Sequence, residues 1–386
     1  MKKIVIMTGT RAEYGLLSPI IKQLKMVKEL DTRLLVTGSH LSPEFGMTIN
    51  EIINDGIHVD KKIEILMSSD SSVGVSKAMG LAIISASEYF EEESPDALMV
   101  LGDRYECLAI CIAALNARIP IIHLHGGEAT EGLIDEAIRN SVTKLSYLHF
   151  ASTETYRKRI IQMGESPNRV FNTGAIGVEN IKKIELLSKT ELENQLGCSL
   201  DKYAVMTFHP VTLEAVTAEI QAEMLMDTFK EFSDIIFICT KANADMNGRA
   251  INECIERYSK KYCNIKCFES LGLKRYLSAV KYSEFVIGNS SSGIIEVPSF
   301  CVPTINIGDR QKGRIQAQSI INCQPDKNSI AEAIEKALST DFKKYVKTVK
   351  NPYDKDNTSD MIVSITKDFL LNNKLKVQKK FFDIEA

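Results

Sequence analysis

The chain has 386 residues, which at roughly 150 residues per domain corresponds to two or three domains. Apolar residues make up 44% and charged residues 25%, a globular composition that excludes disorder as the main state. A net charge of −3 supplies no basic surface for nucleic acid, and no apolar run approaches the length of a membrane span. We therefore expect a small-molecule partner, with no nucleic acid and no membrane; a local group of arginines would still allow an anionic ligand.

The N-terminus favours a cytoplasmic protein, and the cysteines indicate neither a disulfide framework nor a metal site. Residues 1–9 (MKKIVIMTG) are too short in their apolar part for a signal peptide and are typical of a buried first strand. Nine cysteines form no closely spaced framework. Cys107/Cys111 and Cys263/Cys267 have a spacing that could present two thiolates to a metal, but no further ligand pair lies nearby. We interpret them as buried helical residues and expect no metal site.

Short β-rich apolar runs alternate with longer helical stretches in the first half, a pattern typical of a parallel α/β fold. The runs are unbroken, as expected for strands covered by helices on both faces. Strands are predicted at residues 3–8, 32–37, 97–101, 119–123 and 148–151. Helices are predicted at residues 16–28, 75–92 and 105–117.

The second half repeats this organisation. No period of 20 to 50 residues is present, which excludes solenoids and propellers. Two similar α/β halves are therefore predicted, with a junction near residues 174–187 and one more helix at 359–371. Strands of the second half are predicted at residues 203–208, 235–240, 285–288 and 304–307.

Polar groups cluster where predicted strands end, the place where open α/β sheets bind ligands. Residues 8–15 (TGTRAEYG) form a turn whose amides and Arg11 could bind an anion, although a plain turn with a solvated arginine fits equally well. The segment matches neither a P-loop nor GxGxxG, so ATP and NAD motifs lack support. In residues 101–106 (LGDRYE), Asp103 either caps the next helix or forms, with Arg104, a charged pair that faces a ligand.

The densest cluster spans residues 122–128 (IHLHGGE) and 134–139 (IDEAIR). Strand alternation predicts that His123 and His125 share a face, and the double glycine would let the backbone approach a ligand closely. Carboxylates follow Glu128 within eight residues. A zinc site lacks a third spaced ligand, so acid/base chemistry is the better interpretation.

Three segments of the second half also carry polar groups. His209 follows a strand in residues 208–210 (FHP), where a lone histidine is more often structural. Residues 288–293 (GNSSSG) offer donors for phosphate, and Glu296 suits a ribose diol; the alternative, a capping box from Ser292 to Glu296, is one residue too long. Residues 308–314 (GDRQKGR) form another cationic turn. A serine hydrolase is disfavoured because Gly-x-Ser-x-Gly is absent.

In this order, the segments at residues 9–15, 101–106, 125–128, 288–293 and 307–314 resemble the UDP-N-acetylglucosamine 2-epimerases. The likeness runs over nearly the whole chain and is strongest to the bacterial hydrolysing branch, which makes N-acetylmannosamine for sialic acid. It implies the GT-B fold: two Rossmann-like domains, a cleft between them and a C-terminal helix that crosses back to the first domain. The implied domains are residues 1–175, on the sugar side and joined by 359–386, and residues 176–358, which bind UDP.

The resemblance also implies roles for individual residues, no cofactor, and a homodimer or homotetramer. On the nucleotide side, Ser290 and Ser291 would contact phosphate, Glu296 would hold the ribose, and Leu271 would offer backbone groups to uracil. Further substrate contacts are implied for Arg11, Arg104, Asn243, Arg249 and Arg310. The implied catalytic residues are Asp103, His125, Glu128, Asp135, Glu136 and His209.

The implied reaction removes the C2 proton and expels UDP to give 2-acetamidoglucal, to which water then adds. Other members carry Glu where this chain has His125, which leaves His125 or Glu128 as the base. The Gly-Asp-Arg and His-Gly-Gly-Glu segments indicate the hydrolysing branch. Alternatives are a hydrolysing 2-epimerase for UDP- or GDP-N,N′-diacetylbacillosamine in legionaminic acid synthesis, a GT-B glycosyltransferase, and a non-catalytic nucleotide-sugar-binding protein.

Overall fold

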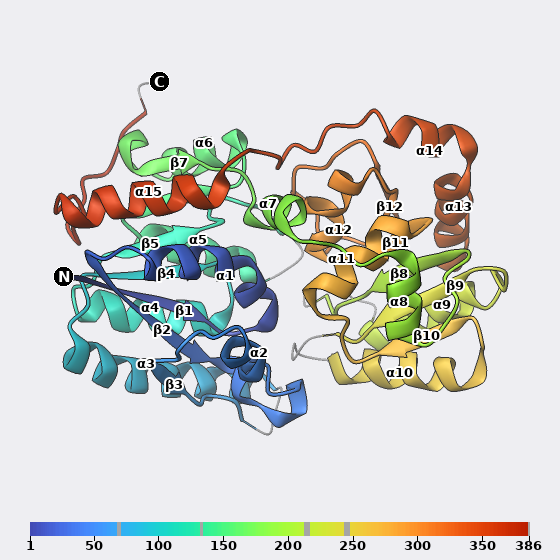
Figure 1. Ribbon diagram of the computed structural model, residues 1–386, viewed down its shortest axis with the longest axis horizontal. Helices are drawn as coiled ribbons and strands as arrows, with labels where there is room; N and C mark the ends of the chain where they lie inside the picture. Colours follow the sequence, from blue (N-terminus) through green and yellow to red (C-terminus); the bar gives the residue numbers. More distant parts are fainter. Residues whose placement is uncertain (68–70, 132–133, 212–216, 243–247, 385–386) are drawn as a thin grey trace. The chain divides into compact units, whose positions relative to one another are not determined.

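The computed structural model describes residues 1–67, 71–131, 134–211, 217–242 and 248–384. The chain divides into two compact units, each with its own parallel β-sheet (Figure 1). Unit 1 comprises Met1–Glu128, Ile134–Asn180 and Lys355–Ala386, and unit 2 comprises Ala129–Leu133 and Ile181–Asp354.

The sheet of unit 1 has seven strands in the order β3-β2-β1-β4-β5-β6-β7, all paired in parallel. The strand order reverses between β1 and β4, so the carboxyl ends of these two strands form the switch point where α/β sheets bind ligands. The strands are β1 (Lys2–Thr8), β2 (Leu30–Thr37), β3 (Lys61–Ile63), β4 (Ala97–Leu101), β5 (Ile121–Leu124), β6 (Leu148–Ala151) and β7 (Val170–Asn172).

Helices cover both faces of this sheet. One apolar cluster joins the sheet to α1, α2 and α15, and a second joins the other face to α3, α4 and α5. The 3-10 helices are η1 (Gly38–Leu41), η2 (Pro43–Phe45) and η3 (Pro167–Arg169). The α-helices are α1 (Arg11–Lys25), α2 (Ile49–Asn54), α3 (Ser72–Glu93), α4 (Tyr105–Asn116), α5 (Asp135–Leu145), α6 (Glu154–Gln162), α7 (Ile176–Lys183), which runs across the division between the units, and α15 (Thr358–Leu371).

The sheet of unit 2 has six parallel strands in the order β10-β9-β8-β11-β12-β13, with its switch point between β8 and β11. Its two faces pack on α9, α10 and α13, and on α8 and α11. The strands are β8 (Tyr203–Thr207), β9 (Ile236–Thr240), β10 (Ile265–Phe268), β11 (Phe285–Gly288), β12 (Thr304–Ile307) and β13 (Ile320–Cys323). The helices are α8 (Lys189–Leu196), α9 (Ala218–Phe229), α10 (Gly248–Lys261), α11 (Gly272–Tyr282), α12 (Ser291–Ile295), η4 (Val297–Phe300), α13 (Lys327–Leu338) and α14 (Thr340–Val346).

These features confirm the predicted fold class, including the return of the C-terminal helix. Helix α15 packs on α1 (Figure 1). Gln23 of α1 donates to Asp360 of α15 at 2.8 Å, and the rings of Phe369 and of Phe171 in β7 lie 6.1 Å apart. Among the described residues, no helix is both long enough and apolar enough to cross a membrane.

The predicted start of the first helix was wrong by five residues. We expected the helix from residue 16, whereas α1 begins at Arg11, because the Thr10 side chain accepts the backbone N–H of Glu13 and caps the helix there. The turn that we expected over residues 8–15 is therefore confined to Gly9 and Thr10.

Candidate active site

A buried guanidinium holds two of the acidic candidates of unit 1. Arg139 of α5 is 1% exposed, and it contacts the carboxylate of Asp103 in the loop after β4. Its Nη1 also donates to Glu136 Oε2 at 2.8 Å and to the carbonyl oxygen of Glu128 at 3.0 Å. A buried cation is tolerated only with such partners, so Arg139 and the two carboxylates hold one another in place.

An imidazole–carboxylate pair continues this network. His125 Nδ1 lies 3.2 Å from Glu128 Oε1, which also accepts a hydrogen bond from Ser152 Oγ at 2.9 Å. Glu128 is 2% exposed, and His125 Nε2 has no hydrogen-bond partner among the described residues. When Nδ1 donates its proton to Glu128, Nε2 is left as an acceptor, which is the arrangement that a general base requires.

Only one of the two neighbouring histidines belongs to this network. Strand β5 ends at Leu124, and His125 adopts a φ of +64°, so strand alternation does not place His125 on the face of His123 as we expected. His123 is fully buried, with Nε2 2.8 Å from the Gly102 carbonyl and Nδ1 3.3 Å from Thr143 Oγ1. Burial lowers the pKa of His123 to about 3. His123 is thus a neutral core residue.

The double glycine after His125 serves packing inside unit 1. A Cβ on Gly126 would lie 2.9 Å from His123 Nδ1, and a Cβ on Gly127 would lie 2.5 Å from the Tyr156 carbonyl oxygen. Gly127 also has a φ of +75°, which L side chains rarely adopt. These neighbours account for both glycines by packing, and the close approach of a ligand to this backbone stays a prediction.

A second buried carboxylate group lies at the carboxyl ends of β1 and β4. Glu13 Oε2 accepts the backbone N–H of Gly9 at 2.7 Å, and Glu106 Oε1 accepts Nε–H of Arg104 at 2.7 Å. A Cβ on Gly9 would lie 2.7 Å from Glu106 Oε1, so both carboxylates flank this glycine. Burial, reinforced by the charge of Glu106, raises the pKa of Glu13 to about 8. Arg104 is therefore tied to this group, and Asp103 is held by Arg139 instead of capping α4.

Two further candidates of unit 1 lie at helix starts. Arg11 is the first residue of α1, and its Nη1 lies 3.8 Å from Glu51 Oε1 of α2. Asp135 is the first residue of α5 and is half-buried beside Glu136. Both positions are at the end of the sheet where the other candidates of unit 1 gather.

In unit 2, Asn289 fixes His209 at the switch point. The fully buried side chain of Asn289, after β11, accepts the His209 N–H at 2.7 Å and donates to the His209 carbonyl at 2.8 Å. The Asn289 carbonyl in turn accepts Arg310 Nη1 at 3.1 Å and Gln311 Nε2 at 2.8 Å. Two predicted site residues, His209 and Arg310, are thus joined through one residue that we had not singled out.

The serine-rich loop after β11 is shaped by one required glycine. Gly288 has a φ of +138°, and a Cβ there would lie 2.0 Å from the Thr207 carbonyl oxygen. This close approach draws the start of the loop against β8. The serines are consequently presented at the carboxyl ends of the two central strands.

The hydrogen bonds of this loop show how its serines and Glu296 are placed. Ser290 is the N-cap of α12, and its Oγ accepts the N–H of Ser292 at 3.4 Å. Ser291 is the first residue of the helix. Ser292 Oγ bonds to the carboxylate of Glu296 and receives the Tyr276 hydroxyl at 2.9 Å. The Ser292–Glu296 contact is therefore a side-chain bond along the helix, and not a capping box.

The remaining candidates of unit 2 are more scattered. The buried Leu271 precedes α11, and its carbonyl accepts Arg275 Nε at 2.7 Å. Arg249 is exposed on the first turn of α10. Asn243 lies outside the described residues. Within the described part of the chain, no three His, Cys, Asp or Glu side chains are grouped so that they could hold a metal ion.

Comparison with known proteins decides the family. Residues 22–367 match the family described as UDP-N-acetylglucosamine 2-epimerase. The chain belongs to this epimerase family. It is 42% identical to polysialic acid biosynthesis protein P7 of Escherichia coli, over 100% of this chain and 98% of the relative. It is 43% identical to the hydrolysing GDP/UDP-N,N′-diacetylbacillosamine 2-epimerase of Campylobacter jejuni, over 89% of each chain.

Solved structures of epimerases share the fold. The UDP-N-acetylglucosamine 2-epimerase of Neisseria meningitidis bound to UDP-N-acetylglucosamine has a TM-score of 0.80 at 18% identity, over 95% of this chain and 100% of that one. At this identity the likeness shows the GT-B-like fold alone. The chain is accordingly an enzyme of the epimerase family with the two-sheet fold of its relatives.

Proposed function

We propose that the protein is a hydrolysing UDP-N-acetylglucosamine 2-epimerase, which converts UDP-N-acetylglucosamine and water into N-acetylmannosamine and UDP. The observation that supports it best is the network around Arg139. Arg139 contacts the carboxylates of Asp103 and Glu136 and the backbone carbonyl of Glu128. The Glu128 carboxylate in turn lies beside the imidazole of His125. Acids and a base held together in this way suit a reaction that moves protons at a sugar ring.

The first step is elimination across C1 and C2. A base removes the C2 proton while the C1–O bond breaks and UDP leaves with the electron pair, giving 2-acetamidoglucal. His125 is favoured as the base because Glu128, itself held by Ser152, lies beside its Nδ1, and its Nε2 has no hydrogen-bond partner among the described residues. In this assignment Glu128 steadies the imidazolium that forms.

Departure of UDP requires stabilisation of the charge that develops on the diphosphate. We assign this role to Arg310 and to the hydroxyls of Ser290 and Ser291, which follow the switch point of unit 2. His209, fixed by Asn289, would donate a proton or a hydrogen bond to the departing phosphate. Glu296 would accept the ribose hydroxyls.

Hydration of the glycal completes the reaction. Water oxygen adds to C1, and C2 is protonated from the face that leaves the manno configuration. Asp103, Asp135 and Glu136 are the carboxyl groups that we assign to this step. Asp103 and Glu136 are kept in place by Arg139.

Two related substrates have support. The family description and the similarity to the Escherichia coli polysialic acid protein favour UDP-N-acetylglucosamine and a role in sialic acid synthesis. The similarity to the Campylobacter jejuni enzyme favours a GDP- or UDP-linked N,N′-diacetylbacillosamine as the second candidate. The two sugars differ at C4, where an acetamido group replaces a hydroxyl, and at C6, where a methyl group replaces a hydroxymethyl group. The shape and polarity of the pocket must therefore distinguish them.

Measurement of kcat/KM tests this assignment. The three nucleotide sugars to compare are UDP-N-acetylglucosamine, UDP-N,N′-diacetylbacillosamine and GDP-N,N′-diacetylbacillosamine. We expect UDP-N-acetylglucosamine to release UDP and N-acetylmannosamine in equal amounts, with a kcat/KM at least about tenfold above those of the bacillosamine substrates. Turnover of a bacillosamine nucleotide alone would replace the proposed substrate by the second candidate. Absence of turnover with all three would contradict the proposed function.

A further inference from the structure

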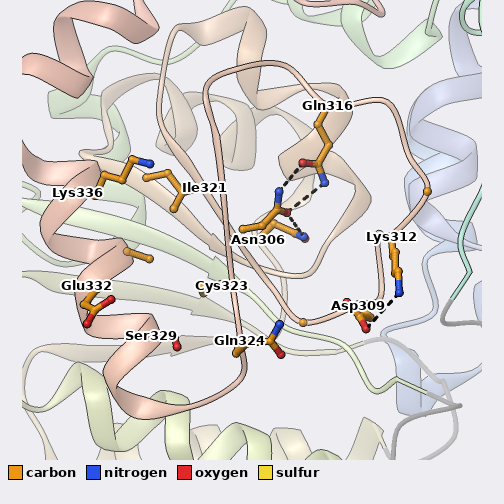
Figure 2. A pocket seen from close by; sticks show the side chains of 14 residues that line it. Asn306, Asp309, Lys312, Gln316, Ile321, Cys323, Gln324, Ser329, Glu332 and Lys336 are labelled. Carbon is orange, nitrogen blue, oxygen red and sulfur yellow. Dashed lines mark hydrogen bonds and ion pairs between the residues drawn. The ribbon is translucent and has the colours of Figure 1, made fainter.

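Unit 2 has a pocket that the proposed reaction does not use. It has a volume of about 580 Å³ and lies over β12 and β13, between the loop at residues 308–313 and one face of α13 (Figure 2). His209, Ser290 and Ser291 follow β8 and β11 at the switch point, whereas the pocket lies over β12 and the edge strand β13. Arg310 belongs to the loop at residues 308–313 but does not line the pocket. The volume falls within the range of small-molecule sites.

The strand side of the pocket is a wall of fixed amides. Asn306 and Asn322 are register partners on β12 and β13, and Asn306 Nδ2 donates to Asn322 Oδ1 at 2.8 Å. Gln316 pairs with the same Asn322 amide through two hydrogen bonds of 2.7 and 3.2 Å, so the three side chains hold one another (Figure 2). Asn306 is 3% exposed, and its Oδ1 has no hydrogen-bond partner among the described residues.

The helix side offers polar and charged groups with no net charge. Ser329, Glu332 and Lys336 lie on one face of α13, since their spacing is one to two helical turns. Across the pocket, Lys312 lies 3.9 Å from Asp309. Lys312 is thus paired with Asp309, and Lys336 lies one helical turn from Glu332, so the charges of the pocket balance.

These groups select one class of ligand. Amides and a hydroxyl donate and accept hydrogen bonds, and carboxylates accept them, which matches a molecule covered with hydroxyl groups. The balanced charge disfavours a phosphate or a nucleotide. No aromatic side chain occurs among the described residues that line the pocket, so a stacked base or other planar ring has no partner.

We propose that this pocket, defined by Asn306, Gln316, Asn322 and Glu332, binds a neutral monosaccharide at a second site, separate from the reacting sugar. The amides provide paired donors and acceptors for vicinal hydroxyls. Glu332 accepts a further hydroxyl from the helix side. Ile321, which is 7% exposed, and Ala333 are the apolar side chains of the lining that the sugar ring would contact.

Ligand-observed NMR with glucose and N-acetylglucosamine, titrated in the presence of saturating UDP, tests the proposal. We expect saturation transfer to at least one of the two sugars in the wild-type protein. Asn322→Leu and Glu332→Ala should each weaken binding about fivefold or more, since each removes hydrogen bonds worth about 1 kcal/mol. The matched control is Glu335→Ala, an exposed residue of α13 that does not line the pocket.

Thermal unfolding of each variant accompanies the titrations. If Asn322→Leu fails to fold, Glu332→Ala, on an exposed helix position, keeps the test decisive. No saturation transfer in the wild-type protein would overturn the proposal. Unchanged binding in folded Glu332→Ala, or displacement of the sugar by inorganic phosphate, would also overturn it.

Discussion

At the scale of single residues, two candidate acids of unit 1 share a buried cation as their partner. Arg139 contacts Asp103 and Glu136, and it also holds the backbone of Glu128. Because these groups share one partner, the loss of any one of them changes the surroundings of the others. Effects of double substitutions in this network should therefore be non-additive.

Asp103→Asn should separate chemistry from nucleotide binding. We expect kcat to fall by about 10² to 10⁴ because the carboxylate that pairs with Arg139 is lost, while the UDP dissociation constant from calorimetry stays within about twofold. Arg310→Ala is the control for nucleotide binding. We expect it to weaken UDP binding, because we assign Arg310 to the diphosphate. Loss of UDP affinity in Asp103→Asn would make Asp103 a nucleotide or folding residue.

Glu13→Gln should change how stability depends on pH. The folded-state pKa of Glu13, about 8, lies above its ordinary value of 4.5 because of burial and the charge of Glu106. The stabilisation from binding this proton is complete below pH 4.5 and is lost as the pH rises to 8. The glutamine stays neutral and can still accept the Gly9 N–H, so the variant should be more stable than wild type at pH 8.5, by about 4 to 5 kcal/mol.

Denaturant unfolding at pH 4.5 and 8.5 measures this difference. At pH 4.5 the two proteins should be nearly equal in free energy of unfolding. An equal difference at both pH values would show that Glu13 does not titrate as described.

At the scale of elements, the C-terminal segment is anchored by one buried ion-pair group. Glu165 is fully buried, and burial alone would raise its pKa. The nearby His149, 3.4 Å from Glu165 Oε2, and hydrogen bonds from Lys144 and Lys379 outweigh burial and lower the pKa to about 2. Lys379 Nζ lies 2.7 Å from Glu165 Oε1 and 2.7 Å from the Ser146 carbonyl. The segment after α15 is thus fixed to unit 1 by charge.

Lys379→Met should destabilise unit 1 by about 1 to 3 kcal/mol, because it removes a partner from a buried carboxylate. Lys380→Met, at the exposed neighbouring position, should change stability by less than about 0.5 kcal/mol. Thermal unfolding of the two variants gives the comparison. Equal melting temperatures would contradict the anchoring role.

The elements also show how far sequence patterns reach. Central strands such as β4 and β11 were predicted with their observed bounds, because a strand covered on both faces is an unbroken apolar run. The edge strands β3, β7, β10 and β13 were missed; they have three or four residues each and include polar positions such as Asn322. A short half-polar strand has no periodicity that separates it from a loop.

At the scale of the whole molecule, the candidate site was predicted residue by residue, but its connections were not. Arg139 meets Asp103 across 36 positions of the chain, and Asn289 meets His209 across 80. No local pattern carries such contacts, since they arise only when strands distant in sequence become neighbours in a sheet. The signals that were available, an arginine one turn after Glu136 and an asparagine directly after β11, became meaningful only with the fold.

Proton NMR of the reaction with UDP-N-acetylglucosamine in D₂O tests the proposed chemistry most directly. Elimination followed by hydration predicts free UDP and N-acetylmannosamine that carries deuterium at C2, because the C2 hydrogen is removed and replaced from solvent. A product still attached to UDP, or N-acetylmannosamine that keeps its original C2 proton, would contradict the account.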